Sequence, residues 1–211
     1  MKIRARLAFV VAAAATVALA AGATAAPNTI TLTDIKGDAN AVNGQGLEPG
    51  MGNNAGPAQR NELDIVSVSL ASTGVTTTVK KKKVFTCTGF TATMELSAPA
   101  GANASYRILG TGVLNATQFW LQYSTAATGT TTTMRHNDGA AKTTALKTPA
   151  KLEGNKIVFT VTEADLKATG EKLAEFKMGS LGADTRTATA ATVPAWDTMD
   201  EDETKSFSPC A

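Results

Sequence analysis

Apolar and polar residues alternate along many short segments of this chain, and this two-residue period most constrains how it can fold. The segment Leu63–Ala71 places apolar side chains on one face and serines on the other, and Gln118–Ser124 and Lys156–Thr162 show the same alternation. Such a period is typical of strands that bury one face. Turn-forming residues separate these segments about every ten residues. We therefore predict an all-β fold, an antiparallel β-sandwich of about seven to nine strands.

Local signals predict where several of these elements begin and end. Ser72-Thr73-Gly74 and Gly154-Asn155 are typical of turns. Thr162 followed three residues later by Asp165 resembles a capping box, which predicts one short helical turn that stops near Gly170. Further strands are predicted over residues 28–34, 76–88, 84–96, 106–113 and 172–178.

The first 25 residues have the layout of a secretory signal peptide, with a basic start, an apolar stretch and small residues before Ala25. Residues 26–211 are then expected to form a single domain, secreted or extracellular. The whole chain carries 20 Lys and Arg against 18 Asp and Glu; without Lys2, Arg4 and Arg6 the balance is 17 against 18, a net charge of −1. A nearly neutral domain lacks the positive field that drives binding to nucleic acid or to anionic lipid, so we expect neither as a partner.

Three segments depart from the strand pattern. Residues 36–61 are dense in Gly, Asn and Pro and predict a long loop. Residues 125–150 are rich in Thr and Ala, which predicts an exposed hairpin or loop that adds little core. Residues 195–211 form an acidic tail, expected to be solvated, whose end is tied down by Cys210.

The chain has two cysteines, Cys87 and Cys210. Export to an oxidising compartment favours a disulfide between them, because that compartment allows such bonds to persist. The alternative is two free thiols or a bond between molecules. No cysteine directly follows the expected cleavage site, and no later segment is long and apolar enough to cross a bilayer, so no lipid or transmembrane anchor is expected in the mature chain.

A candidate calcium site follows the first predicted strand. Calcium takes several oxygen ligands from carboxylates, amides and carbonyls held in a turn. Gly37 and Gly44 permit the bends that such a turn needs, although the spacing differs from that of an EF-hand loop. The alternative is an Asx-rich turn in which these side chains bind their own backbone. The candidate ligands are Asp34, Asp38, Asn40 and Asn43.

The two tryptophans, Trp120 and Trp196, are candidate ligand-binding residues. A flat ring exposed on a sheet face matches the apolar face of a sugar ring. The alternative is a structural role, because a tryptophan in a strand commonly fills the core or lies under a loop.

No catalytic set is apparent in the sequence, and we expect a protein that is not an enzyme. His136, the only histidine, lies in a segment that predicts an exposed hairpin turn, and it lacks the partners that acid–base chemistry would need. Haem ligation by His136 with Met94 or Met134 is a weaker alternative to a core methionine and a surface histidine.

Four consecutive lysines, Lys80–Lys83, interrupt a strand-rich segment. We interpret them as a strand edge or hairpin tip that charge keeps soluble, although a binding patch is the alternative.

The order of these segments resembles bacterial secreted β-sandwich domains of the DOMON-like or family-9 carbohydrate-binding-module-like type. Three segments carry the resemblance: Thr-Asp-Ile-Lys-Gly-Asp at 33–38, Leu-Asp-Ile-Val-Ser-Val at 63–68, and Gly-Asn-Lys-Ile-Val-Phe-Thr-Val at 154–161 followed by Leu166. The resemblance implies a sandwich that binds sugars, haem or other ligands, in some cases with structural calcium. The lysine run and the Thr/Ala-rich segment have no counterpart in that pattern.

These observations predict a secreted, non-catalytic module that binds a ligand or carbohydrate, with a polysaccharide or another cell-surface component as the expected partner. The alternative is an extracellular or cell-envelope structural module without a small ligand. Structural calcium is the one cofactor that we expect.

Overall fold

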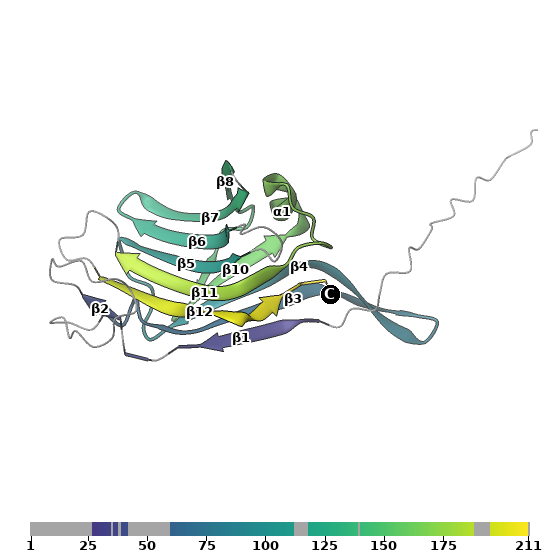
Figure 1. Cartoon of the computed structure of the whole chain (residues 1–211), viewed down its shortest axis with the longest axis horizontal. Coiled ribbons are helices and arrows are strands. Elements are labelled where there is room, and N and C mark those ends of the chain that lie inside the picture. The colour runs from purple at the N-terminus through teal and green to yellow at the C-terminus, as the bar shows by residue number, and fades with distance from the viewer. Residues whose placement is uncertain are drawn as a thin grey trace, which may run out of the picture.

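The computed structural model describes residues 27–34, 36–37, 39–41, 60–111, 118–138, 140–187 and 195–210. Within these ranges the protein is an all-β sandwich with one short helix, as the alternation predicts, and Figure 1 shows its two layers. Twelve strands are described, more than the expected seven to nine. Their bounds are β1 Thr29–Thr33, β2 Asn40–Ala41, β3 Ile65–Val79, β4 Lys82–Leu96, β5 Ala104–Thr111, β6 Gln118–Ala126, β7 Gly129–Asp138, β8 Ala140–Ala145, β9 Lys151–Glu153, β10 Lys156–Thr162, β11 Met178–Thr187 and β12 Ala195–Phe207.

The strands form two antiparallel sheets. The five-stranded sheet has the order β1-β3-β4-β10-β9, and the seven-stranded sheet has the order β2-β12-β11-β5-β6-β7-β8. Each sheet turns its apolar face towards the other. Side chains such as Phe90 and Phe159 from the first sheet and Ile108, Leu121 and Phe207 from the second are fully buried in the shared core.

Helix α1, Glu163–Thr169, follows β10 as the capping box predicts. The Thr162 hydroxyl accepts the Asp165 amide proton, and the Asp165 carboxylate accepts the Thr162 amide proton. Gly170, with φ of 98°, ends the helix in the left-handed conformation. Leu166 is buried and secures the helix to the core.

The predicted turn at Ser72–Gly74 is wrong, because β3 runs through it. The pairing of β3 with β4 shifts register between Thr73 and Gly74. A Cβ on Gly74 would lie 2.2 Å from the carbonyl oxygen of Thr86, so the close approach of the two strands requires glycine here. The glycine therefore marks a bulge in a continuing strand.

The prediction of a strand over 172–178 is also wrong in most of its length. Residues 173–175 form a turn, with the Glu175 amide bonded to the Lys172 carbonyl and the Phe176 amide bonded to the Leu173 carbonyl. Leu173 and Phe176 are both buried at a spacing of three, which suits a turn rather than a strand. Strand β11 starts only at Met178.

The segment expected to be a solvated acidic tail forms a strand, β12, between β11 and β2, and part of it is buried. Ala195, Asp197 and Met199 are buried at alternating positions, and Phe207 is fully buried near the end. The high charge of the segment hid this alternation. Beyond β12, the sulfurs of Cys87 and Cys210 lie 2.01 Å apart and form a disulfide.

The Thr/Ala-rich segment forms the expected hairpin, made by β7 and β8 at the edge of the seven-stranded sheet. It adds more core than predicted, because Met134 and Leu146 are buried. The expected loop over 36–61 lies largely outside the described residues, and so does the signal-peptide segment.

Candidate functional site

The outer face of the seven-stranded sheet carries the candidate site. In β6, Phe119, Leu121 and Tyr123 are buried, while Trp120 and Gln122 alternate with them and are half-buried on the opposite face. Strand geometry makes this outcome necessary, because successive side chains point to opposite faces. The core-forming residues of β6 therefore place Trp120 on the outer face.

The strand register brings three outward side chains into one row. Trp120 is paired with Leu109 of β5 on one side and with Arg135 of β7 on the other. Directly opposed residues in antiparallel strands point to the same face and contact each other. The guanidinium carbon of Arg135 lies 4.5 Å from the centre of the Trp120 ring, a cation–π contact.

Arg135 depends on this ring for its position. Its Nε is shielded from solvent and has no hydrogen-bond partner within the described part of the chain. The stacked guanidinium covers the side of the tryptophan that faces β7. The orientation of Trp120 is thus stabilised by a neighbour that the sequence places 15 positions away.

A second arginine stands on the β5 side of the tryptophan. Arg107 makes two hydrogen bonds to Asp184 of β11, with Nε 2.7 Å from Oδ1 and Nη2 2.6 Å from Oδ2. Two parallel charge-assisted bonds hold a guanidinium in a defined plane. Arg107 is partly exposed and so presents fixed donors next to the ring.

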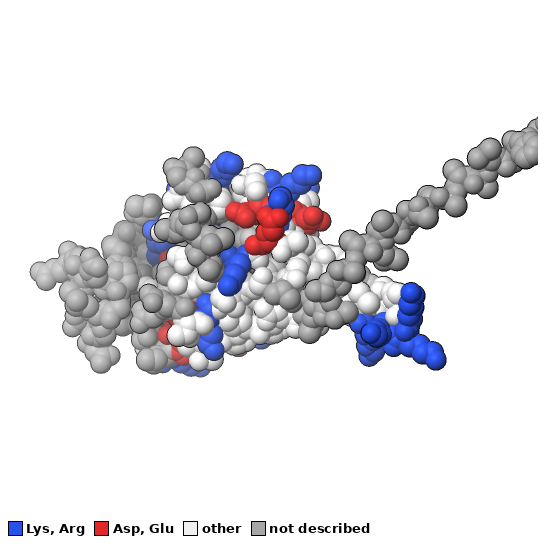
Figure 2. Space-filling view, turned by 45° about the vertical axis from the view of Figure 1, so that its right-hand side comes forward, with Lys and Arg blue, Asp and Glu red and all other residues white. Residues whose placement is uncertain are grey.

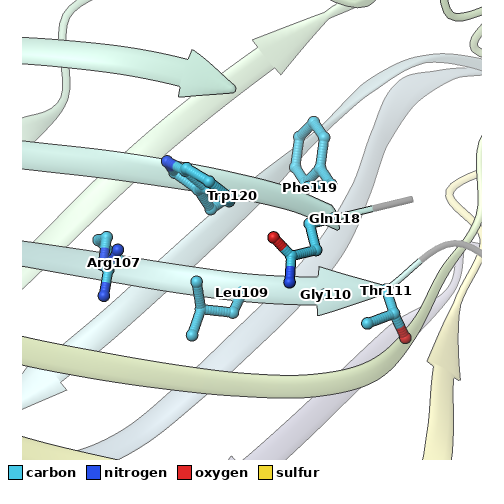
Figure 3. Close-up of a pocket in the computed structure, with 7 residues that line it drawn as sticks. All are labelled: Arg107, Leu109, Gly110, Thr111, Gln118, Phe119 and Trp120. Atoms are coloured by element: carbon cyan, nitrogen blue, oxygen red, sulfur yellow. The ribbon is translucent and has the colours of Figure 1, made fainter. Parts of the chain in front are cut away.

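A pocket of about 240 Å³ lies beside the tryptophan, and Figure 3 shows its lining. All of its lining residues belong to β5 and β6, so it occupies the side of Trp120 opposite Arg135. The apolar wall is formed by the ring and Leu109, and Gln118, Thr111 and Arg107 add polar groups. Gly110, at the floor, faces the core, where a Cβ would lie 2.7 Å from the terminal methyl of Met178.

This arrangement is suited to binding a small ligand. One flat apolar surface stands beside an amide, a hydroxyl and an immobilised guanidinium, which together can orient a small polar ligand. Among the described residues, the pocket lining includes no carboxylate and no histidine.

The structure describes the side chain of only one of the two tryptophans, Trp120. Trp196 pairs with Arg186 of β11 and with Asn40 of β2 through its backbone, and its side chain lies outside the described residues. Trp120 alone of the two can be assigned to the pocket.

The calcium prediction stays a prediction. Asp38, Asn43 and the side chain of Asn40 lie outside the described residues, and within those residues no group of three or more His, Cys, Asp or Glu could hold a metal ion. Asp34 is half-buried just after β1, and its amide donates to the Val66 carbonyl.

Two buried aspartates at this end of the sandwich bind backbone instead. Both carboxylate oxygens of Asp64 accept the Gly37 amide proton, at 2.8 and 3.0 Å, and the Ser97 hydroxyl contacts Oδ2. Asp197 Oδ2 lies 2.6 Å from the Ile65 amide nitrogen. These bonds join the start of β3 to the segment after β1 and to β12.

The prediction of His136 in an exposed turn is wrong. His136 lies within β7, 7% exposed, and its Nε2 is 2.8 Å from Glu171 Oε1, just after α1. Its inward position follows from the alternation of β7, in which Met134 is also buried. The histidine therefore joins β7 to the residues that follow the helix.

Arg107, Gln118, Arg135 and Asp184 were missed by sequence reasoning. Each occupies an outward position of a strand, and period-2 alternation could have identified that much. Their convergence on Trp120 depends on the register of four strands, which the sequence does not state.

No protein-family model, curated protein or solved structure matches the chain. In the part of the chain that the structure describes, no helix is long and apolar enough to span a membrane.

Proposed function

We propose that this protein is an exported, non-catalytic carbohydrate-binding module whose ligand stacks on Trp120. The observation that carries the proposal is the position of the ring, with Arg135 on one side and a pocket on the other. A sugar ring has an apolar face formed by C–H groups and an equatorial rim of hydroxyls. The Trp120 ring matches the first, and the polar groups of the pocket match the second.

The size of the pocket favours a single sugar unit at this position. Its volume of about 240 Å³ lies below the roughly 300–1,000 Å³ typical of pockets for drug-sized ligands. The pocket opens on a sheet face, so neighbouring units of a polysaccharide could extend across it.

The side chains of the site are held in place before a ligand binds, which lowers the entropic cost of binding. A guanidinium that is already held by Asp184 loses little conformational freedom when a hydroxyl binds to it. The same holds for an aromatic ring already stacked against Arg135. The site is thus preorganised for a polar ligand.

Export supports an extracellular polysaccharide as the ligand. The first 25 residues resemble a signal peptide, and the chain pairs both of its cysteines, which is typical of proteins in oxidising compartments. The alternative proposal is a structural module of the cell envelope that has no small ligand.

The test is affinity gel electrophoresis on a panel of soluble polysaccharides, with the wild-type protein and Trp120→Ala. We expect retardation by at least one polysaccharide and roughly thirty-fold weaker binding by the variant, because a buried tryptophan anchor commonly contributes at least about 2 kcal/mol. Trp120→Phe keeps an aromatic ring and should bind with intermediate affinity.

A matched control removes another exposed apolar side chain. Leu152 of β9 is 49% exposed on the five-stranded sheet, and Leu152→Ala should bind as the wild type does. Equal retardation of the wild type and a correctly folded Trp120→Ala would reject the site, and no retardation by any polysaccharide would favour the structural module.

A further inference from the structure

The hairpin formed by the distal parts of β3 and β4 projects from the sandwich as an arm (Figure 1). We define the arm as Gly74–Cys87. Strand β1 pairs with β3 only up to Ala71, and β10 pairs with β4 only from Gly89 onwards. Beyond these points the two strands pair only with each other among the described residues. With six residues on the outgoing strand, the arm reaches about 20 Å from its base.

The base of the arm is firmly tied to the body. Cys87 is bonded to Cys210, and the Ser72 hydroxyl donates a hydrogen bond to the Pro209 carbonyl at 2.6 Å. The amide of Asn28 donates to the same hydroxyl at 3.0 Å. Because its base is held by these bonds, the arm can transmit a contact at its tip to the sandwich.

All four lysines of the run lie at the tip of this arm, so the run forms a hairpin tip rather than a strand edge. Between Ile65 and Met94 the chain contains no Asp or Glu, and Figure 2 shows the blue cluster at the end of the arm without red atoms beside it on the face in view. Screening limits electrostatic interactions to about 8 Å at physiological ionic strength. The nearly neutral balance of the whole molecule, from which we expected no binding to anionic lipid, therefore does not cancel the field at the tip.

The backbone at the tip is strained in a way that solubility does not explain. Lys80 and Lys81 have φ of 50° and 66°, so both central residues of the two-residue turn are left-handed. Such turns strongly favour Asn-Gly, because a side chain of ordinary shape is disfavoured at positive φ. Backbone strain of this kind is commonly retained where function requires particular side chains. Lysines at other positions of the hairpin would keep it soluble without this cost.

Two exposed valines accompany the lysines. Val75 is 58% and Val79 is 41% exposed. The two are four positions apart in β3, so their side chains lie on the same face of the strand. Val79 is directly opposite Lys82, so this lysine shares that face. The two valines thus form an apolar strip that leads to the lysine side chains at the tip. This arrangement suits a surface that is negatively charged on the outside and apolar just beneath.

We propose that the arm docks onto bilayers that contain anionic phospholipids. The lysines contact the headgroup phosphates, and Val75 and Val79 enter the interface below them. The exposed valines distinguish this partner from a soluble acidic polymer, which offers no apolar layer. The proposal rests on residues distant from Trp120 and is independent of carbohydrate binding.

The experiment is co-sedimentation of the chain without its first 25 residues with vesicles. One set contains 30% phosphatidylglycerol in phosphatidylcholine, on the order of natural anionic content, and the other contains phosphatidylcholine alone. We expect binding to the anionic vesicles only, with affinity that falls as salt is raised from 50 to 500 mM, roughly the range over which screening becomes strong.

The decisive variant is Lys80→Asn with Lys81→Gly. It removes two charges and supplies the residues that the turn favours, so its melting temperature should not fall below that of the wild type. Two lysines near an anionic surface correspond to a roughly thirty-fold change in affinity, which is the loss we expect. The matched control, Lys151→Asn with Lys205→Asn, removes the same charge from exposed positions on β9 and β12 and should bind within about twofold of wild type.

A second variant tests the valines. Val75→Thr with Val79→Thr keeps β-branched side chains, so the strand is preserved, and should weaken vesicle binding about tenfold by reducing apolar burial.

Four results would overturn the proposal: no binding to anionic vesicles at 50 mM salt, equal binding to uncharged vesicles, undiminished binding by the turn variant, or undiminished binding by the valine variant. Heparin binding that survives the valine changes while vesicle binding is absent would indicate an acidic polymer instead. Trp120→Ala should bind vesicles normally, which separates this proposal from the previous one.

Discussion

Tyr106 illustrates how a single buried polar group is accommodated in this core. Its ring is fully buried, and its hydroxyl accepts a hydrogen bond from the Gly101 amide at 2.7 Å and donates one to the Glu62 carbonyl at 3.1 Å. Burial raises the pKa of Tyr106 to about 12, because the phenolate would be poorly solvated there. Burial also raises the pKa of Tyr123, the other tyrosine of the chain.

This shift predicts a loss of stability in alkali. A pKa that is higher in the folded than in the unfolded state favours folding below the unfolded value of 10, and the contribution is lost as the pH rises towards about 12. The free energy of unfolding should fall by up to about 3 kcal/mol over this interval, and the fall should be smaller in Tyr106→Phe. Urea denaturation at several pH values measures it; equal pH dependence in both proteins would contradict the assignment.

At the scale of single residues, alternation along β6 was sufficient to single out Trp120 and Phe119 as belonging to opposite faces. It could not predict that Arg135 covers one side of the ring, because that contact depends on which strand pairs with β6 and in which register. His136 was misplaced for a related reason. Its neighbours Asn137 and Asp138 are turn-forming types, but Asn137 pairs with β6 and β8 and Asp138 pairs with β8.

Among the elements, helix α1 is the one whose sequence signals were most complete. Burial of Asp165 acts to raise its pKa, but hydrogen bonds from the Thr162 hydroxyl and from the amides of Lys147 and Thr162 outweigh burial and lower the pKa. The carboxylate thus caps the helix and also binds the segment after β8.

Asp165→Ala should lower the free energy of unfolding by about 2 kcal/mol near neutral pH, through the lost cap and the unpaired Lys147 amide. Because the pKa is lowered by folding, this contribution exists above the unfolded value of 3.8 and disappears as the pH falls through the folded value. The difference between wild type and variant should therefore shrink in acid. Glu163→Ala, in the same helical turn, should cost at most about 1 kcal/mol. Chemical denaturation at pH 7 and pH 3 measures the free energy of unfolding of the wild type and of both variants. A difference between wild type and Asp165→Ala that is the same at both pH values would contradict the cap.

Two of the mispredicted elements share one physical cause. Gly74 and the acidic residues of β12 follow local rules for turns and for solvated tails, but contacts with distant strands decide their conformation. The Gly74 backbone meets Thr86, and Asp197 binds the Ile65 amide. Such long-range contacts cannot be read from a window of a few residues.

At the scale of the whole molecule, the period-2 pattern predicts the sandwich class but not the strand order. The C-terminal strand β12 lies inside the seven-stranded sheet, next to a strand formed by residues 40–41. The pair Cys87 and Cys210 was the one sequence signal that connected the end of the chain with an early strand.

This disulfide spans a sequence separation of 123, so its removal should destabilise the molecule considerably. In the chain-entropy model, a loop of that length contributes up to roughly 5 kcal/mol by restricting the unfolded chain. The double variant Cys87→Ser with Cys210→Ser should unfold at markedly lower denaturant, and reductant should move the wild type to the same midpoint. Unchanged midpoints in the variant and in reduced wild type would show that the bond adds no stability.

The most direct test of the central claim, a sugar stacked on Trp120, uses the fluorescence of that residue alone. Trp196→Phe leaves Trp120 as the only tryptophan. Titration with oligosaccharides of glucose, xylose, mannose and N-acetylglucosamine should produce a saturable change in emission with at least one of them, because stacking replaces water at the ring. If the folded variant shows no change with any of these sugars while affinity electrophoresis of the wild type shows retardation, the ligand binds elsewhere and the claim is wrong.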